Sequence, residues 1–393
     1  MLEPFFRTHE YLVERVAALV HRQLMDAINW NDRLIGIVGF RGVGKTTMML
    51  QYARDNFSLR ERKCLYVNLD NFFFQGIDLI DFAAEFQKGG GSTLLIDNVH
   101  KQVGWCKILR EMYERFPKLH IVFAASSVIP TGAENPELDG LLKAYVLKGF
   151  SFREYLNLKV GLNLRSYSIR EIQNRHERIA SEIMEQVKPM EHMRGYLHHG
   201  YYPFFLERGN FGERMHKVMN LMLEVDVLHQ NQIELKYLER LKRLFYILGT
   251  GDTGAPNVSQ LAVDVCTSRA TVMNYVKFLT DANLISLVYR KGEAFPKKPA
   301  RTLLNNTNLV YAMSNGKPDM QLLSETFFHN AVWGIYDVNA GDRSCTFLVG
   351  DDQRFRILNE EPKRRASEVL YVRGDIEMGH DQEVPLWLYG FLY

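Results

Sequence analysis

Short apolar runs alternate with amphipathic segments from residue 34 to residue 158. The apolar runs have the length of buried strands, and the amphipathic segments repeat their apolar residues at helical spacing. Strands are predicted at 34–39, 64–70, 93–97, 120–126 and 144–150, and helices at 46–55, 76–86, 105–116 and 151–158. Strands that alternate with helices predict an α/β fold with a parallel sheet covered on both faces.

Before and after this region the pattern is helical or mixed. Thr8 is predicted to cap a first helix whose apolar face holds Leu12, Val16, Leu19 and Val20. Residues 165–250 show helical periodicity with many charges, and the turn-rich GTGDTGAP (249–256) separates them from a small helical segment with a strand-like tail. The aromatic end PLWLYGFLY (385–393) favours burial as a strand, with an exposed partner surface as the alternative.

Composition and charge narrow the class of protein. The 393 residues suffice for about two or three domains, and 46% hydrophobic with 24% charged residues is ordinary for a globular chain. A net charge of +2 does not by itself indicate nucleic-acid binding. The four cysteines lie far apart, without metal-ligand spacing, and neither a signal core nor a membrane-length apolar stretch is visible. We therefore expect a reduced, cytoplasmic protein with no membrane contact.

The segment GFRGVGKT (39–46) fits the Walker A pattern G-x-x-x-x-G-K-[ST] between a predicted strand and a predicted helix. Such a P-loop wraps backbone N–H groups around phosphates at the positive end of a helix. Its lysine reaches the β- and γ-phosphates, and its hydroxyl ligates Mg²⁺. We expect a nucleotide site formed by Gly39, Arg41, Gly42, Val43, Gly44, Lys45, Thr46 and Thr47, in which Lys45 also serves catalysis.

The second half of such a site is an acidic residue at the end of a neighbouring strand. TLLID (93–97) supplies Asp97 as the second Mg²⁺ ligand beside Thr46. Many nucleotide-hydrolysing enzymes carry a glutamate next, where this chain has Asn98, an amide that orients water but cannot accept its proton. His100 is the alternative group to act on water. Ser126 is the favoured γ-phosphate contact at the strand tip, with Ser127 as the alternative.

Four segments together resemble one family. GFRGVGKTT, LLIDNVHK, VFAASS and LKGFSFREYL follow one another as in the bacterial and archaeal AAA-type P-loop ATPases of the archaeal-ATPase group, common in Bacteroides-like genomes. The C-terminal PLWLYGFLY is also similar to that family. The resemblance implies ATP and Mg²⁺ as cofactors and four domains: a P-loop ATPase domain (1–160), a helical subdomain (161–250), a winged helix (251–312) and a restriction-endonuclease-like domain (313–393).

Three departures from the family pattern concern chemistry. Asn98 replaces the usual glutamate, and GLLKAYVL (140–147) stands where members often carry two arginines, with Lys143 as the one basic residue left. In the last domain, Thr346 stands in place of the metal-binding aspartate. Glu360, Glu361 and Lys363 are predicted to lie in a loop after the strand, and Asp351 or Asp352 would fit only with a shifted register. Nuclease activity is therefore not expected.

The predicted winged helix offers a second binding function. Ser268 is predicted to cap its second helix, from which Arg269, Asn274 and Lys277 would face duplex DNA. Further phosphate contacts are expected from Lys291, Lys297, Lys298 and Arg301. The alternative is that this segment packs on the ATPase core or a partner.

Three functional hypotheses follow. The chain is a slow ATPase that acts as a nucleotide-dependent switch, an ordinary ATPase whose water is positioned by residues such as His100, or a DNA-binding regulator or defence effector. ATP and ADP are favoured over guanine nucleotides because the base-reading NKxD motif is absent from the sequence. The sequence leaves open whether the chain forms a homo-oligomer or binds a protein partner.

Overall fold

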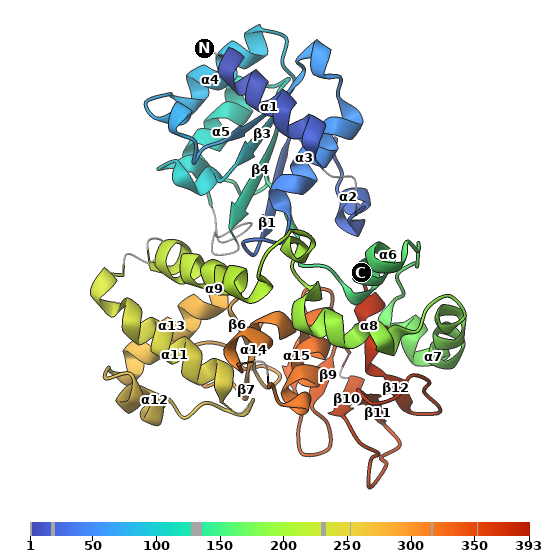
Figure 1. Cartoon of the computed structure of the whole chain (residues 1–393). Coiled ribbons are helices and arrows are strands. Elements are labelled where there is room, and N and C mark those ends of the chain that lie inside the picture. The colour runs from blue at the N-terminus through green and yellow to red at the C-terminus, as the bar shows by residue number, and fades with distance from the viewer. Residues whose placement is uncertain are drawn as a thin grey trace. The chain divides into compact units, whose positions relative to one another are not determined.

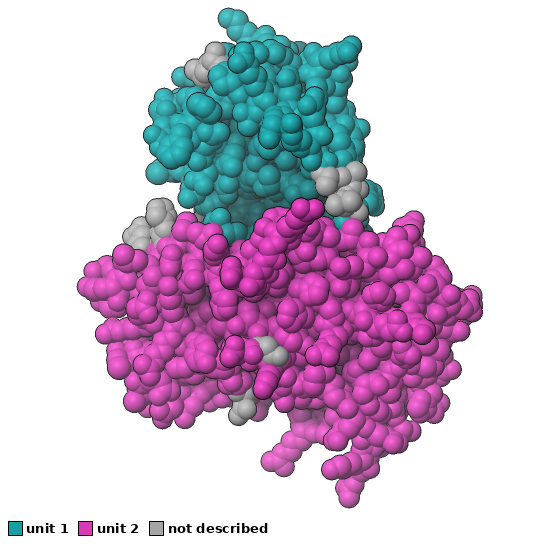
Figure 2. Space-filling view, in the orientation of Figure 1, with its two compact units in different colours: residues 1–149 teal, residues 150–393 magenta. Residues whose placement is uncertain are grey.

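The computed structural model describes residues 2–16, 20–126, 136–228, 233–251, 253–315, 317–351 and 353–393. The chain forms two compact units, residues 1–149 and 150–393, coloured separately in Figure 2. No helix within the described ranges is long and apolar enough to cross a membrane.

Unit 1 is a parallel five-stranded sheet with helices packed against it (Figure 1). The strand order is β2-β3-β4-β1-β5. Every residue of β1 and β3 is buried, as expected for the continuous apolar strands of a covered parallel sheet. The elements are β1 (Leu34–Gly39), β2 (Cys64–Asn68), β3 (Thr93–Asp97), β4 (His120–Ser126), β5 (Lys143–Val146), α1 (Glu3–Arg15), α2 (Gln23–Ala27), α3 (Lys45–Asn56), α4 (Leu79–Lys88) and α5 (Trp105–Arg115).

The strands and helices predicted between residues 34 and 158 are confirmed in type, with bounds that differ by up to four residues. The prediction for Thr8 is wrong. Helix α1 begins at Glu3, with a proline in its first turn, a position where the missing proline N–H costs nothing. Thr8 lies inside the helix, where its hydroxyl donates to the carbonyl oxygen of Pro4 at 3.0 Å.

Unit 2 combines helices with two sheets (Figure 1). Its helices are α6 (Phe152–Val160), α7 (Ile169–Met184), α8 (Pro189–Gly195), α9 (Phe211–Leu221), α11 (Leu238–Thr250), α12 (Val258–Asp264), α13 (Arg269–Asp281), α14 (Thr307–Met313) and α15 (Met320–Val332). An antiparallel pair joins β6 (Ile285–Val288) and β7 (Arg301–Leu304). A mixed sheet of order β12-β11-β10-β9-β8 holds β8 (Val338–Ala340), β9 (Phe347–Val349), β10 (Gln353–Leu358), β11 (Val369–Arg373) and β12 (Glu383–Pro385).

The aromatic C-terminal segment is buried, as predicted, but it is not a strand. Residues Leu386–Phe391 form a 3-10 helix, η9, with fully buried side chains. It packs against α6, and a Cβ added to Gly390 would lie 2.4 Å from the Cβ of Phe152. The Arg153 Nε donates to the carbonyl oxygen of Tyr393 at 3.0 Å. The two most distinctive motifs of the sequence, SFREYL and the tail, therefore belong to one core.

Helix α6, which the sequence assigned to the ATPase domain, lies in unit 2 together with all three predicted C-terminal domains. The division of unit 2 into a helical subdomain, a winged helix and an endonuclease-like domain stays a prediction.

His9 of α1 stabilises the edge of the sheet in unit 1. Strand β2 is an edge strand, so its outward N–H groups need partners from outside the sheet. The His9 Nδ1 accepts a hydrogen bond from the Tyr66 backbone N–H at 3.0 Å, and the imidazole is 2% exposed. Burial lowers the pKa of His9 to about 4. The folded protein therefore holds this imidazole neutral at pH 7.

Acidification is expected to destabilise unit 1 through His9. In the unfolded chain His9 has a pKa of about 6.5 and binds a proton at a pH where the folded protein keeps the imidazole neutral. The free energy of unfolding therefore decreases as the pH falls from 6.5 towards 4. Between pH 7 and pH 5 the loss amounts to about 2 kcal/mol. Urea unfolding of wild type and His9→Asn at both pH values measures it, because the asparagine Oδ1 accepts the Tyr66 N–H at either pH. An equal pH effect in both proteins would contradict this assignment.

Candidate functional site

The chain between β1 and α3 forms a tight loop that only glycine permits at three places. Gly42 and Gly44 have φ angles of 86° and 99°, in the left-handed region that other residues rarely adopt. A Cβ on Gly39 would lie 2.3 Å from the carbonyl oxygen of Leu147, the residue after β5. The loop leads directly into the N-terminus of α3, where backbone N–H groups and the helix dipole favour an anion.

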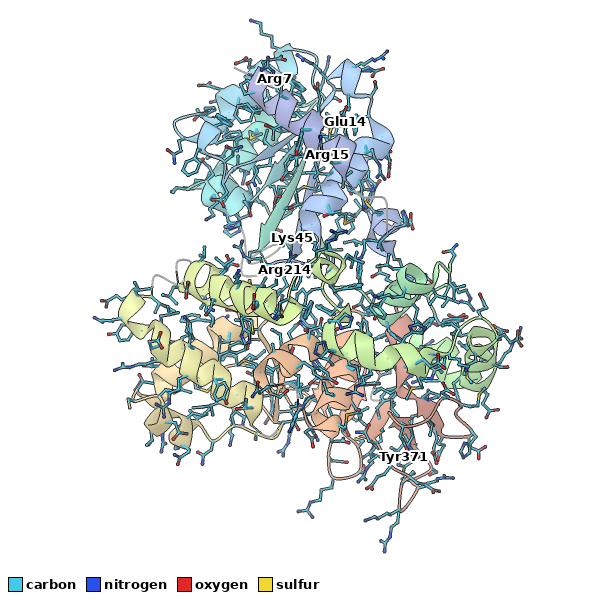
Figure 3. All side chains as sticks on the ribbon, in the orientation of Figure 1. Arg7, Glu14, Arg15, Lys45, Arg214 and Tyr371 are labelled. Atoms are coloured by element: carbon cyan, nitrogen blue, oxygen red, sulfur yellow. The ribbon has the colours of Figure 1, made fainter. Side chains whose placement is uncertain are left out.

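Lys45, the first residue of α3, places its ammonium group over this loop at the carboxyl end of β1 (Figure 3). Its Nζ donates to the carbonyl oxygens of Gly39 and Phe40 at 2.8 Å and 2.9 Å. The ammonium therefore lies beside the anion-binding end of α3, as phosphate binding requires.

Asp97, at the end of β3, is a buried carboxylate with three hydrogen-bond donors. Its Oδ2 accepts from the Thr46 hydroxyl at 2.5 Å and from the Tyr66 hydroxyl at 2.9 Å, and its Oδ1 accepts from the Asn98 N–H at 2.9 Å. Such donors offset the cost of burying a carboxylate that is 4% exposed. Burial, followed by the nearby Asp97 charge, raises the pKa of Tyr66 well above its usual range, so this hydroxyl remains a donor.

Thr46 and Asp97 fit a magnesium ion. Hydroxyl and carboxylate oxygens are the hard donors that Mg²⁺ prefers, and nucleotide sites complete its shell with water and phosphate oxygens. Among the described residues, no group of three or more histidine, cysteine, aspartate or glutamate side chains could hold a metal. A metal that takes few protein ligands is therefore the kind that this pair suits.

Asn98 supports Asp97 through its backbone and faces β2 with its side chain. Its φ of 54° places it in the left-handed region, which asparagine tolerates better than most residues. Its Nδ2 donates to the Asn68 Oδ1 at 3.0 Å, and Asn68 lies level with Asp97 in the neighbouring strand. His100 lies nearby in a 3-10 turn, η3 (Val99–Lys101).

The other residues predicted for the site lie around the same edge of the sheet. Ser126 ends β4 beside Gly39 of β1 and is 5% exposed. Arg41 lies in the loop and Thr47 in the first turn of α3. Val43 is fully buried. Ser127, the alternative to Ser126, is outside the described residues.

Two residues of this site were missed in the sequence. Arg22 is 6% exposed and donates to three carbonyl oxygens, those of Val43 at 3.0 Å, Lys148 at 2.7 Å and Gly149 at 3.0 Å. Nothing local marks this arginine, which lies 21 residues before the loop it holds. The position of Tyr66 could have been recognised from the sequence. It lies two residues before the end of β2 and therefore on the same face of the strand as Asn68.

Residues 31–156 match the family model of an AAA domain, and residues 190–318 match the model of a domain of unknown function. No curated protein matches the chain. Similar solved structures include Orc1 of Aeropyrum pernix in complex with DNA (12% identity, TM-score 0.31, covering 80% of this chain and 92% of that chain). They also include AMPPCP-bound DnaA of Aquifex aeolicus (14% identity, TM-score 0.22, 71% and 88%) and PCH-2 of C. elegans (14% identity, TM-score 0.23, 72% and 66%). The family match and the loop geometry identify residues 31–156 as an AAA-type P-loop domain.

Proposed function

We propose that unit 1 binds ATP with Mg²⁺ and that the protein is a slow ATPase acting as a nucleotide-dependent switch. The observation that carries the proposal is the contrast at the carboxyl end of the sheet. The phosphate loop and the Thr46–Asp97 pair are in place, whereas the next position carries an amide, Asn98, with its side chain bonded to Asn68.

Phosphate binding rests on the loop and the start of α3. The N–H groups around Gly42 and Gly44 would hold phosphate oxygens, Lys45 would bridge the β- and γ-phosphates, and Thr47 would add a contact. Ser126 is the candidate for the γ-phosphate. Thr46 and Asp97 would hold Mg²⁺, which neutralises charge on the phosphates.

Slow hydrolysis rests on Asn98. A carboxylate at this position could accept a proton from water, and a positioned general base contributes roughly 10²- to 10⁴-fold to a rate. An amide cannot accept that proton, and the Asn98 Nδ2 already donates one hydrogen bond to the Asn68 Oδ1. His100 stays the alternative base, and it is the residue on which the ordinary-ATPase hypothesis depends.

The switch rests on Arg22, which connects the phosphate loop to the end of unit 1. One guanidinium nitrogen holds the Val43 carbonyl in the loop, and another holds the carbonyls of Lys148 and Gly149, the last residues before unit 2. A change of loop conformation on phosphate binding would therefore strain or release the connection to unit 2.

Duplex DNA binding through α13 stays a prediction. Ser268 caps this helix, as expected, by accepting the Thr271 N–H at 3.1 Å, and Arg269 and Asn274 are exposed. Lys277 pairs with Asp281 on the same helix, at 2.7 Å. Arg301, expected to contact phosphate, instead donates to the buried Glu325 at 2.8 Å and stabilises unit 2.

We propose no nuclease activity for the C-terminal sheet. Thr346 directly precedes β9, where the family has its metal-binding aspartate. Glu360, Glu361 and Lys363 lie in the loop after β10, as predicted. Asp351 is exposed and pairs with Arg170 at 3.7 Å, and Asp352 lies outside the described residues.

Measuring ATP turnover separates the first two hypotheses. Wild type is expected to bind MgATP with turnover below the roughly 10 s⁻¹ median of enzymes, and Lys45→Ala to lose binding. Asn98→Glu supplies the missing base and is expected to raise turnover at least about tenfold. Asn98→Gln, equally long but uncharged, is the matched control. Fast wild-type turnover that Asn98→Glu barely changes would favour the ordinary ATPase.

Removing the Tyr66 hydroxyl is expected to weaken only the Mg²⁺-dependent part of nucleotide binding. Tyr66→Phe takes one donor from Asp97, which is worth about 1 kcal/mol, or about fivefold in affinity. ATP titrations with Mg²⁺ and with EDTA measure the difference, and Tyr11→Phe, on an exposed ring of α1, is the control. Equal weakening in EDTA would show that Tyr66 does not act through the metal ligand.

A further inference from the structure

Unit 2 contains a groove of about 720 Å³ with a strongly basic lining. The connection between β6 and β7 contributes Arg290 and Lys291, the loop between β8 and β9 contributes Asp342 and Arg343, and β10 contributes Arg354. Leu348 of β9 adds apolar surface. Four cationic side chains thus face one carboxylate.

One backbone hydrogen bond assembles this groove from distant parts of the chain. The Ala340 N–H, at the end of β8, donates to the carbonyl oxygen of Tyr289 at 2.7 Å. The residues that follow on each side, Arg290 and Gly341, are therefore brought together. A Cβ on Gly341 would lie 2.3 Å from the Cys345 carbonyl oxygen, so the loop closes tightly.

Asp342 fixes the loop that carries Arg343. Its Oδ1 accepts the Ser344 N–H at 2.7 Å, and its Oδ2 accepts from Arg354 at 2.6 Å. Arg354 also donates to the Ser344 hydroxyl at 2.7 Å. These donors, Ser344 first, hold the pKa of Asp342 well below its usual range. The carboxylate that lines the groove, Asp342, is thus engaged with Arg354 rather than with Arg290 or Arg343.

Arg290 and Arg343 are exposed, and no acidic side chain in the described part of the chain lies within ion-pair distance of either. Two exposed guanidinium groups that line one groove without a counter-charge suit phosphate, which arginine binds through two parallel hydrogen bonds. Lys298, exposed in the same β6–β7 connection, extends the positive charge along the chain beyond the groove lining.

We propose that this groove binds backbone phosphates of a nucleic acid. A single small phosphate would engage one pair of arginines, whereas cations spread over the groove and the β6–β7 connection suit successive phosphates of a polymer. The inference is independent of ATP binding in unit 1. It also differs from DNA reading by α13, because it assigns phosphate contacts to Arg290 and Arg343 and no base contact.

The test measures how nucleic-acid binding by the full chain depends on salt concentration. The fluorescence anisotropy of labelled duplex and single-stranded oligonucleotides reports the binding. Arg290→Ala/Arg343→Ala is expected to bind about tenfold or more weakly, with a slope of log K against log salt reduced by nearly 2. Lys188→Ala/Lys236→Ala removes the same charge from exposed positions elsewhere in unit 2 and is expected to bind like wild type. Arg269→Ala/Asn274→Ala tests α13 in the same assay.

Equal slopes in the groove variant and the charge control would overturn the proposal, and a loss confined to the α13 variant would leave DNA binding to that helix alone. Binding of inorganic phosphate or ATP at the groove without retention of any oligonucleotide would also overturn it, as would a wild type that binds neither strand form at low salt. Thermal melting checks that the groove variant folds, since both arginines are exposed and cost little to remove. None of these outcomes depends on ATP binding, which the Lys45→Ala variant reports.

Discussion

The hydrogen bond between Thr46 and Asp97 is the constraint on which the site in unit 1 depends. Strand β4 lies between β1 and β3, so the helix that follows β1 must reach across a strand to meet the end of β3. The contact at 2.5 Å records that it does. It requires the tight glycine turns that start α3 and the hydrogen-bond donors that offset the cost of burying the Asp97 side chain. In the proposed function, this contact is what would let a loop that holds phosphate also position Mg²⁺.

The backbone and the side chain of Asn98 make separate contacts. Its backbone N–H donates to Asp97, and its side chain donates to Asn68, so the residue supports the proposed metal ligand without offering a base for water. A glutamate would keep the first contact, which belongs to the backbone, but it would lose the second and would fit the left-handed φ of 54° less well than asparagine does. In the proposed function, this separation is the reason why an amide at position 98 would preserve nucleotide binding while slowing hydrolysis.

Local patterns predicted the sheet and the phosphate loop, because buried strands and Gly-Lys-Thr turns are specified by neighbouring residues. Contacts between distant residues were not predictable. Arg22 donates to a loop 21 residues away, and the N–H of Ala340, at the end of β8, donates to Tyr289, which follows β6 of the other sheet in unit 2. The strand predicted for the C-terminal segment was wrong for a related reason. Its aromatic residues suit a strand, but the close approach of Gly390 to Phe152 is a tertiary contact that local sequence does not reveal. The cap predicted at Thr8 was wrong because α1 begins at Glu3, with Pro4 in its first turn.

A net charge of +2 conceals two contrasting groups of arginines. The first group is buried or half-buried and donates to carbonyl or carboxylate oxygens, so it stabilises the fold. It consists of Arg22, Arg301 and Arg373. Arg290 and Arg343 follow segments joined by the Ala340–Tyr289 hydrogen bond, yet both are exposed and no acid among the described residues pairs with them. Fixing like charges together costs free energy that folding alone does not recover. A ligand that carries phosphates would recover it, so the groove has a physical reason to bind one.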